Sequence, residues 1–436
     1  MRSRDPARAA GRSTSALTLT LLSGAILAMS SRAALSEAPE VSVEDFTFAG
    51  PLGSQGAKIQ KSAADHFKVT VGPRPKPPSE QPPPQAPKGS EMKINCKVYP
   101  HLMALGDRTR PKLAWEAKTV EEHRAWRRKA RAKIRQLVGR MPQRVPLQVK
   151  WAEREQTPLF TRHKIYVRSE RNYWVPAYYF VPKGAAKKTP AVVCLHGHSG
   201  VMPYIREGTR QEKAKSRQDS LDYAVYLAEH GYITIAAVVR GWNETRHKPP
   251  HSCDRLTLSL FLVGRTPVGL RCWDASRLID FLQTQEVVDA EKIAVAGLSG
   301  GGMLACFLPA LEDRIKAAMI GGYFCTFRES IYSIHHCICN CVPGVMEWVE
   351  MSDIVACCAP KPVLIIAGTK DSIFPIDATR RAYRKLARTY KLLGAADKLD
   401  KDFFDGPHAW SHTKTLPFLH KHLGRPPGHK GKDGSP

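Results

Sequence analysis

Short apolar stretches alternate with helix-like stretches through the second half of the chain. Largely apolar runs predict buried strands at Ala191–Leu195, Tyr232–Val239, Lys292–Ala296, Ile315–Gly321, Val363–Ala367 and Asp402–Phe404. Stretches with helical periodicity lie between several of them, at Ser220–His230, Gly269–Gln283 and Arg380–Leu393. Because strands that alternate with helices are typical of a parallel sheet covered by helices, the pattern predicts the α/β class.

A further helix and three strands are predicted before this alternation begins. Thr119 and Glu122 have the spacing of a capping box, and Gly139 follows the last expected helical residue, Val138. The apolar positions of this helix share one face, and Arg and Lys occupy the other: Trp126, Ala130, Ile134, Leu137 and Val138. Alternating or aromatic-rich stretches then predict strands at Leu147–Trp151, His163–Val167 and Trp174–Val181.

The two ends of the chain depart from this pattern. Residues 1–33 combine a basic start, an apolar run from Ala16 to Met29 and a small-residue motif at Ser31–Ala33, which predicts a signal peptide. The apolar run is short for a membrane span, so we expect a secreted or periplasmic protein without stable membrane insertion, with an uncleaved anchor as the alternative. Residues 34–93 are predicted to be a Pro-rich disordered linker, 94–423 the folded domain, and 424–436 a disordered basic tail.

The chain is strongly basic, with 66 Lys and Arg against 40 Asp and Glu and a formal net charge of +26. Such a charge can indicate an anionic partner. The basic residues are scattered, however, with local excess in Met1–Arg32, Arg108–Lys150 and Lys421–Lys432, and the sequence shows no nucleic-acid-binding signature. A solvated basic surface is the favoured interpretation, and no nucleic-acid partner is predicted. The oligomeric state is not predicted.

The motif Gly297-Leu298-Ser299-Gly300-Gly301 lies between a predicted strand and a predicted helix. A G-x-S-x-G in a strand–turn–helix context is the pattern of a nucleophile elbow. The serine backbone of such an elbow is strained, and the flanking glycines leave room for the strand and helix to approach each other. We therefore predict Ser299 to be a catalytic nucleophile; the alternative is a Gly-rich turn with a bystander serine.

A nucleophilic serine requires a base within hydrogen-bond reach and an acid that orients the base. Asp371 follows the strand Val363–Ala367, and His408 follows the last predicted strand, so both are expected at the carboxyl edge of the sheet. The order Ser, Asp, His is that of the α/β hydrolases. Asp377 is the rival acid, although its position favours an N-cap of the following helix.

Two backbone N–H groups are predicted to form an oxyanion hole. One belongs to Gly300, directly after the nucleophile, and the other to His198, in the loop His196–Gly200 after the first core strand. The side chains of His196 and His198 are interpreted as loop scaffolding rather than as bases.

Together, the His196–Gly200 loop, GLSGGG, GTKDSIFP and GPHAW resemble the α/β-hydrolase superfamily, and more narrowly its dienelactone-hydrolase-like and acetyl-xylan-esterase-like branch, from about Lys93 to Leu423. The resemblance implies a mostly parallel eight-stranded sheet flanked by helices, an N-terminal extension and no cofactor. Val239-Arg240-Gly241-Trp242 matches the strand-RG loop of that branch. True dienelactone hydrolases use a cysteine nucleophile, so Ser299 favours ordinary ester hydrolysis.

Eleven cysteines, an odd number, leave at least one thiol unpaired within the chain. Several, such as Cys194, Cys306 and Cys325, lie in apolar runs and are expected to act as core residues. The segment from His335 to Gly344 concentrates His and Cys, with cysteines at 337, 339 and 341. Its favoured interpretation is a structural loop lining the pocket, ahead of a disulfide and of a metal site, because C-x-C-x-C on one segment lacks the second ligand pair of structural zinc sites. No metal is predicted.

These features predict an exported serine hydrolase that cleaves carboxylic esters through Ser299, His408 and Asp371, with small acyl groups on carbohydrate-like alcohols as substrates. Aromatic faces suit sugar rings, so Trp242 and Trp410 are predicted to bind substrate, while Trp273, Tyr323 and Trp348 are weaker candidates. Two alternatives remain: a serine peptidase of the prolyl-oligopeptidase type, and a non-catalytic polyanion-binding protein on a hydrolase scaffold.

Overall fold

The computed structural model describes residues 58–61, 67–70, 96–247 and 252–427. The chain divides into two units, Met1–Ile94 and Asn95–Pro436. In the first, strands β1 (Lys58–Lys61) and β2 (Phe67–Thr70) pair antiparallel, a short pairing that the proline-rich composition did not predict. The predicted signal peptide, the rest of the predicted linker and the end of the tail lie outside the described residues.

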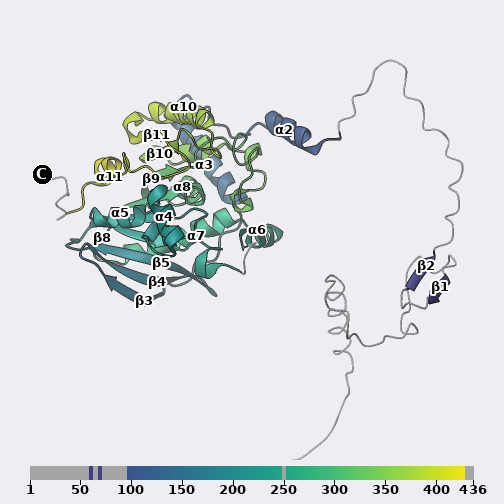
Figure 1. Cartoon of the computed structure of the whole chain (residues 1–436). Helices are drawn as coiled ribbons and strands as arrows, with labels where there is room; N and C mark the ends of the chain where they lie inside the picture. The colour runs from purple at the N-terminus through teal and green to yellow at the C-terminus, as the bar shows by residue number, and fades with distance from the viewer. Residues whose placement is uncertain (1–57, 62–66, 71–95, 248–251, 428–436) are drawn as a thin grey trace, which may run out of the picture. The chain divides into compact units, whose positions relative to one another are not determined.

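The second unit is built on a nine-stranded sheet in the order β11-β10-β9-β8-β6-β7-β5-β4-β3 (Figure 1). β3 (Val149–Gln156), β4 (Phe160–Glu170) and β5 (Tyr173–Pro182) pair antiparallel, and β5 joins β7 antiparallel. The other neighbours pair parallel: β6 (Thr189–Leu195), β7 (Ile233–Ala237), β8 (Val288–Leu298), β9 (Ile315–Gly321), β10 (Val363–Gly368) and β11 (Leu399–Phe404). The predicted fold class is confirmed. The predicted number of strands, eight, is corrected to nine, because all nine stretches predicted from the residues form strands of one sheet.

Helices cover both faces of the sheet, because successive residues of its central strands point to opposite sides. Along β6, Val193 and Leu195 belong to one apolar cluster and Val192 and Cys194 to the other. The first cluster includes residues of α3 (Val120–Leu137), α7 (Pro267–Gln283), α8 (Gly300–Leu311), α9 (Met351–Ala356) and α10 (Ile376–Leu392). The second includes residues of α5 (Tyr223–Glu229) and α11 (Thr415–Leu423).

The predicted capping of α3 is partly realised. The Thr119 side chain accepts a hydrogen bond from Glu122 N at 3.1 Å, as a capping box requires. The Glu122 carboxylate accepts from Lys118 N instead, one residue before the cap. Ala130 and Ile134 are buried on the face that the apolar spacing predicted.

The sequence pattern did not predict α2 (Val98–Arg108), α4 (Arg210–Gln218), α6 (Ser252–Leu262), α9 or α11. α4 explains why: its sequence is RQEKAKSRQ, in which Ser216 is the buried residue, so it offers no apolar stripe to detect. Its start is instead defined by a complete capping box between Thr209 and Glu212.

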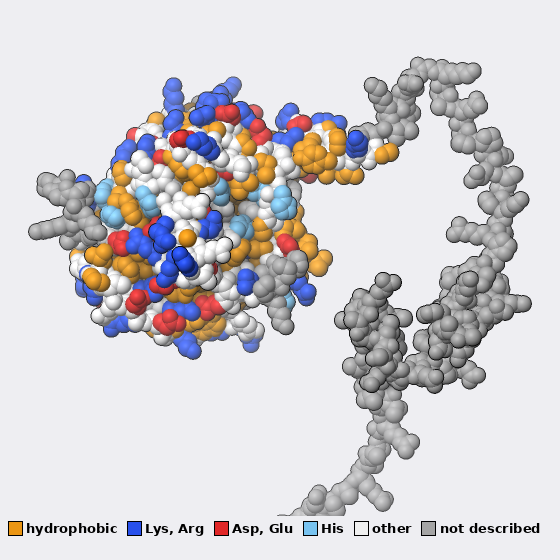
Figure 2. All heavy atoms as spheres, viewed as in Figure 1, with side chains coloured by type: hydrophobic (Ala, Val, Ile, Leu, Met, Phe, Trp, Pro, Cys, Tyr) orange, Lys and Arg blue, Asp and Glu red, His pale blue; other side chains and the backbone are white. Residues whose placement is uncertain are grey.

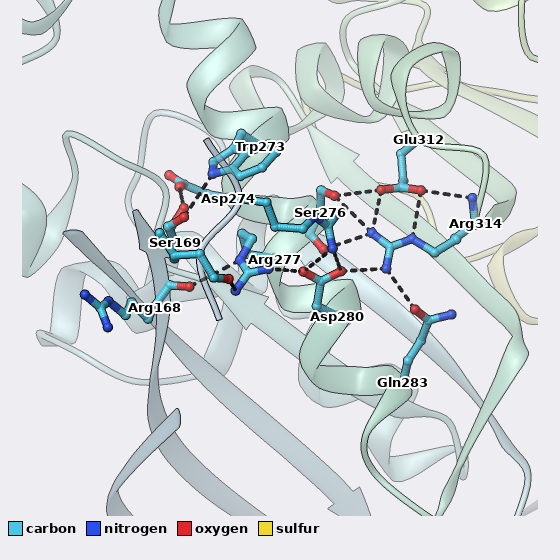
Figure 3. A network of polar contacts seen from close by, with 12 residues as sticks. Arg168, Ser169, Trp273, Asp274, Ser276, Arg277, Asp280, Gln283, Glu312 and Arg314 are labelled. Atoms are coloured by element: carbon cyan, nitrogen blue, oxygen red, sulfur yellow. Dashed lines mark hydrogen bonds and ion pairs between the residues drawn. The ribbon is translucent and has the colours of Figure 1, made fainter. Parts of the chain in front are cut away.

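A polar network ties α7 to β4 and to the turn between α8 and β9 (Figure 3). The Ser169 hydroxyl of β4 donates to Asp274 at 2.5 Å, and Arg314 donates to Asp280 at 2.7 Å and to Glu312 at 2.7 Å. Burial alone would raise the pKa of Glu312, but hydrogen bonds from Arg314 and Ser276 outweigh it and lower that pKa to about 2. The Arg314–Glu312 pair therefore stays ionised at neutral pH and fixes α7 against the sheet.

Lys and Arg side chains are interspersed with Asp and Glu on the face drawn in Figure 2, in keeping with a solvated basic surface. Within the described residues, no helix combines the length and apolar character needed to cross a bilayer.

Candidate active site

Ser299 lies at the sharp turn where β8 ends and α8 begins. Its backbone has φ 60° and ψ −119°, a strained conformation for a residue with a side chain. The turn is held on both sides, because Ser299 N donates to Gly321 O at 3.0 Å and Ser299 O accepts from Met303 N at 2.8 Å. The predicted elbow geometry is thus present in the backbone.

The glycines beside Ser299 are required by close backbone contacts. A Cβ on Gly297 would lie 2.1 Å from Gly301 O, and a Cβ on Gly301 would lie 1.8 Å from Leu195 O. Both contacts are with backbone atoms, which cannot rotate away. The elbow therefore brings α8, β8 and β6 closer together than any side chain at these positions would allow.

Gly301→Ala is expected to destabilise the protein by at least about 3 kcal/mol, because the added methyl collides with the β6 backbone. Gly394→Ala is the matched control: Gly394 has φ +63° and open space around its Cβ position, so only the left-handed backbone penalty of about 1 kcal/mol applies. Urea unfolding curves compare the two. Equal stability of the variants would mean that the elbow is not packed as described.

Asp371 and His408 meet at the carboxyl edge of the sheet. His408 Nδ1 and Asp371 Oδ2 are 2.6 Å apart, and the other carboxylate oxygen accepts from Ile373 N and Phe374 N, each at 3.0 Å. Asp371 is 6% exposed. His408 Nε2 is also buried, and it has no hydrogen-bond partner among the described residues. The acid is thus fixed, and it orients an imidazole whose second nitrogen is available.

The rival acid lies elsewhere. Asp377 is in the first turn of α10, where it pairs with Arg380 at 3.1 Å. Pro375, not Asp377, occupies the N-cap position, so the N-cap prediction is wrong by two residues. An acidic residue in the first turn still interacts favourably with the helix dipole.

Ser299 and His408 line the same pocket, which has a volume of about 350 Å³. Its wall includes polar side chains, among them Asn340 and the Lys215–Asp219 pair, whose charged atoms are 2.6 Å apart. The pocket is also lined by His198, Ser199, Tyr204, Leu221, Leu298, His335, His336, Cys337, Ile373 and Phe374. Tyr204, Lys215, Asp219 and Leu221 were not predicted, because nothing in the local sequence distinguishes them from packing or surface residues, whereas Asn340 belongs to the segment that was predicted to line the pocket.

The loop after β6 packs directly on the N-terminus of α8. A Cβ on Gly300 would lie 2.9 Å from His198 Cε1, so Gly300 and His198 are close neighbours. Gly300 is the first residue of α8, a position whose N–H has no partner within the helix. The loop that carries one predicted oxyanion donor therefore packs against the residue that carries the other.

The two histidines of this loop have different environments. His196 is 2% exposed and its Nε2 accepts from Val239 N at 2.9 Å. Burial lowers the pKa of His196 to about 3, so it is neutral scaffolding, as interpreted from the sequence. His198 Nε2 instead lies 3.2 Å from Cys339 Sγ.

Trp242 is the predicted aromatic residue that lies near the pocket. Its ring makes an edge contact with the His198 ring, with centroids 5.6 Å apart, and Trp242 lines a second hollow that shares His198 and Cys337 with the serine pocket.

The prediction that Trp410 binds substrate is corrected by the structure. Trp410 is 2% exposed, its Nε1 donates to Thr415 at 3.2 Å, and its ring packs against Tyr223 in the core. Tyr323 is also buried. The Nε1 of Trp273, a residue of α7, donates a hydrogen bond to Ser169 O of β4 (Figure 3). An aromatic residue after a strand was therefore insufficient to predict exposure to the pocket.

The cysteine-rich segment lines the pocket through His335, His336 and Cys337. The pKa of the His336 imidazole is lowered, mainly because the ring is buried. The sequence predicted no metal because the segment itself lacks a second ligand pair, and the fold corrects that reasoning by bringing further potential ligands to the segment. The atoms that could bind a metal all lie within 4.8 Å of one another and come from His198, Cys253, Cys337 and Cys339.

Comparisons with known proteins agree with this fold. The model of the Abhydrolase family matches residues 96–417. YtaP of Bacillus subtilis (strain 168), which is provisionally named a hydrolase, is 24% identical over 277 residues, or 62% of this chain and 90% of YtaP.

Two solved structures share the fold at low identity. A provisionally assigned acetyl xylan esterase from Bacteroides fragilis superposes with a TM-score of 0.60 at 16% identity, covering 78% of this chain and 93% of that one. A glucuronoyl esterase from Solibacter usitatus superposes with a TM-score of 0.53 at 15% identity, covering 73% and 98%.

Proposed function

The chain belongs to the Abhydrolase family, and we propose that it is an exported serine hydrolase that cleaves carboxylic esters. The observation that carries the proposal is the fixed Asp371–His408 pair, at 2.6 Å, whose histidine lines the same pocket as a serine on a strained elbow. A nucleophile, an oriented base and neighbouring backbone donors are the parts that acyl transfer requires.

In the proposed mechanism, Ser299 Oγ attacks the ester carbonyl carbon while His408 Nε2 takes the hydroxyl proton. The carbonyl π electrons move to oxygen, and the N–H groups of Gly300 and His198 stabilise the oxyanion. The carbon–oxygen bond to the alcohol then breaks, and His408 returns its proton to the departing alkoxide. Water, deprotonated by the same histidine, attacks the acyl carbon; the bond from that carbon to Ser299 Oγ then breaks, the acid is released, and His408 returns the proton to Ser299 Oγ.

Asp371 has a positioning role in this scheme. Its Oδ2 holds the Nδ1 side of His408, so that the lone pair of the neutral ring lies on Nε2. Two backbone N–H groups fix its Oδ1, and the imidazole stacks on Phe374 with centroids 5.7 Å apart. The base is therefore oriented from several sides before substrate arrives.

The proposed substrate is a small acyl group, such as acetyl, on a polar alcohol such as a sugar. Polar side chains in the pocket wall, such as Lys215, Asp219 and Asn340, support a hydroxyl-rich alcohol. Structures of the same fold include the acetyl xylan and glucuronoyl esterases described above, which supports a carbohydrate ester. We expect Trp242, which lines the neighbouring hollow, to contact a sugar ring.

A series of p-nitrophenyl esters tests the acyl preference. We expect kcat/KM to fall at least about tenfold from acetyl to octanoyl, because the proposed acyl subsite holds a small acyl group and excludes added methylenes. Acetate release from acetylated oligosaccharides tests the alcohol, and Trp242→Ala should weaken that reaction more than hydrolysis of p-nitrophenyl acetate. A preference for octanoyl esters together with no acetate release from the sugars would instead indicate a lipase-like enzyme.

A further inference from the structure

Four potential metal ligands converge beside the serine pocket from parts of the chain far apart in sequence. Their ligand atoms all lie within 4.8 Å of one another. The imidazole is that of His198, in the loop after β6, and one thiol is that of Cys253, in the first turn of α6. The other two thiols belong to Cys337, the N-cap of the short helix η4 (Ile338–Asn340), and to Cys339 within that helix. Cys253 and Cys339 are buried, and the other two are partly buried.

The spacing suits a tetrahedral ion. With Zn–S near 2.3 Å and Zn–N near 2.0–2.1 Å, neighbouring ligand atoms of a tetrahedron lie about 3.5–3.8 Å apart. Cys337 Sγ and Cys339 Sγ are 3.3 Å apart, and His198 Nε2 and Cys339 Sγ are 3.2 Å apart. Both separations need only a few tenths of an ångström of adjustment, and the sulfur–sulfur separation is well beyond the ~2.05 Å of a disulfide.

A buried cation next to the group supplies an independent argument from charge. Arg271 is 3% exposed, its Nε donates to Arg240 O at 3.0 Å, and its Nη2 lies 3.5 Å from Cys253 Sγ. A buried guanidinium is costly unless an anion faces it. Three thiolates around a divalent ion leave one net negative charge, which Arg271 would neutralise.

We infer that His198 Nε2 and the thiolates of Cys253, Cys337 and Cys339 bind one thiolate-preferring divalent ion, zinc in the first instance. Four protein ligands complete a tetrahedron and leave no position for water, so the site is structural. It fastens α6 and the cysteine-rich segment to the loop after β6.

The site also has a consequence for the neighbouring serine. His198 packs against Gly300, so a metal on its Nε2 would hold the loop that carries the proposed oxyanion donor. This positioning role rests on the proposed function, whereas metal binding itself does not.

Metal content measures the inference directly. The full chain, carrying no histidine tag and kept reduced, is dialysed against zinc and then against a weak chelator before elemental analysis. We expect one zinc per chain, and the same value in Ser299→Ala, so that failure of the proposed hydrolase function would leave this result unchanged. Protein that stays metal-free with the three thiols reduced, or that carries a Cys337–Cys339 disulfide, would overturn the site.

Matched cysteine variants test the ligand set. Cys337→Ser and Cys253→Ser should each lower zinc retention at least tenfold, whereas Cys341→Ser, in the same segment but outside the group, should retain one zinc. Equal loss in Cys341→Ser would contradict the assignment. The absorption spectrum of wild-type protein loaded with cobalt gives a second readout that does not depend on a variant folding. Intense d–d bands in the red region together with a thiolate charge-transfer band would indicate a tetrahedral thiolate site. An octahedral cobalt spectrum would overturn the inference.

Discussion

Ser299→Ala is expected to fold normally and to lower kcat/KM for ester hydrolysis by a factor of about 10⁴ or more. The substitution removes the attacking oxygen and leaves the elbow intact, since alanine keeps the Cβ that the strained backbone already accommodates. Steady-state hydrolysis of p-nitrophenyl acetate, with circular dichroism and a thermal melt to verify folding, measures the effect.

Ser199→Ala is the control, because Ser199 is the other serine lining the pocket. It should retain activity within about tenfold of wild type, since Ser199 has no role in the proposed proton transfers. A folded Ser299→Ala protein with a substantial fraction of wild-type activity, or a Ser199→Ala protein that is inactive, would refute the assignment of the nucleophile.

Asp371→Asn is expected to lower kcat by about 10⁴ with little change in stability. An asparagine amide facing His408 Nδ1 can donate to it, which favours the tautomer with the proton on Nε2, where the base must instead accept one. Its oxygen can still accept the hydrogen bonds from Ile373 N and Phe374 N, so the loop should keep its shape.

Asp377→Asn provides the comparison for this variant. Asp377 is exposed and pairs with Arg380 on the helix surface, so its replacement should change kcat less than twofold. If the two variants lose activity to the same extent, the orienting acid has been misidentified. If Asp377→Asn alone is inactive, Asp377 is the acid.

The sheet could be predicted from the sequence because its central strands have a local hydrophobic pattern that does not depend on the rest of the fold. β6, β10 and the second half of β8 are short apolar runs bounded by polar residues or turns, and parallel strands buried on both faces have this pattern. The elbow could also be predicted, because contacts with the local backbone and with β6 require glycine at its flanking positions. The eight strands implied by the resemblance were one too few, whereas the nine stretches identified from the residues were correct.

Features that depend on tertiary contacts could not be predicted. Trp410 follows a strand and precedes a helix, yet the packing of α11 and Tyr223 encloses its ring, which no local pattern reveals. The cysteine group required Cys253 and His198 to meet residues far along the chain. Sequence spacing within the cysteine-rich segment alone argued against a metal, because half of the ligands lie outside it.

Covalent labelling identifies the nucleophilic residue. Wild-type protein is treated with a fluorophosphonate, digested and mapped by mass spectrometry, with Ser199→Ala and Ser299→Ala treated in parallel. We expect a single adduct on Ser299 in the wild type and in Ser199→Ala, and none in Ser299→Ala. An adduct on another residue, or a folded wild-type chain that does not react while a known serine hydrolase does, would contradict the assignment of Ser299 as the nucleophile.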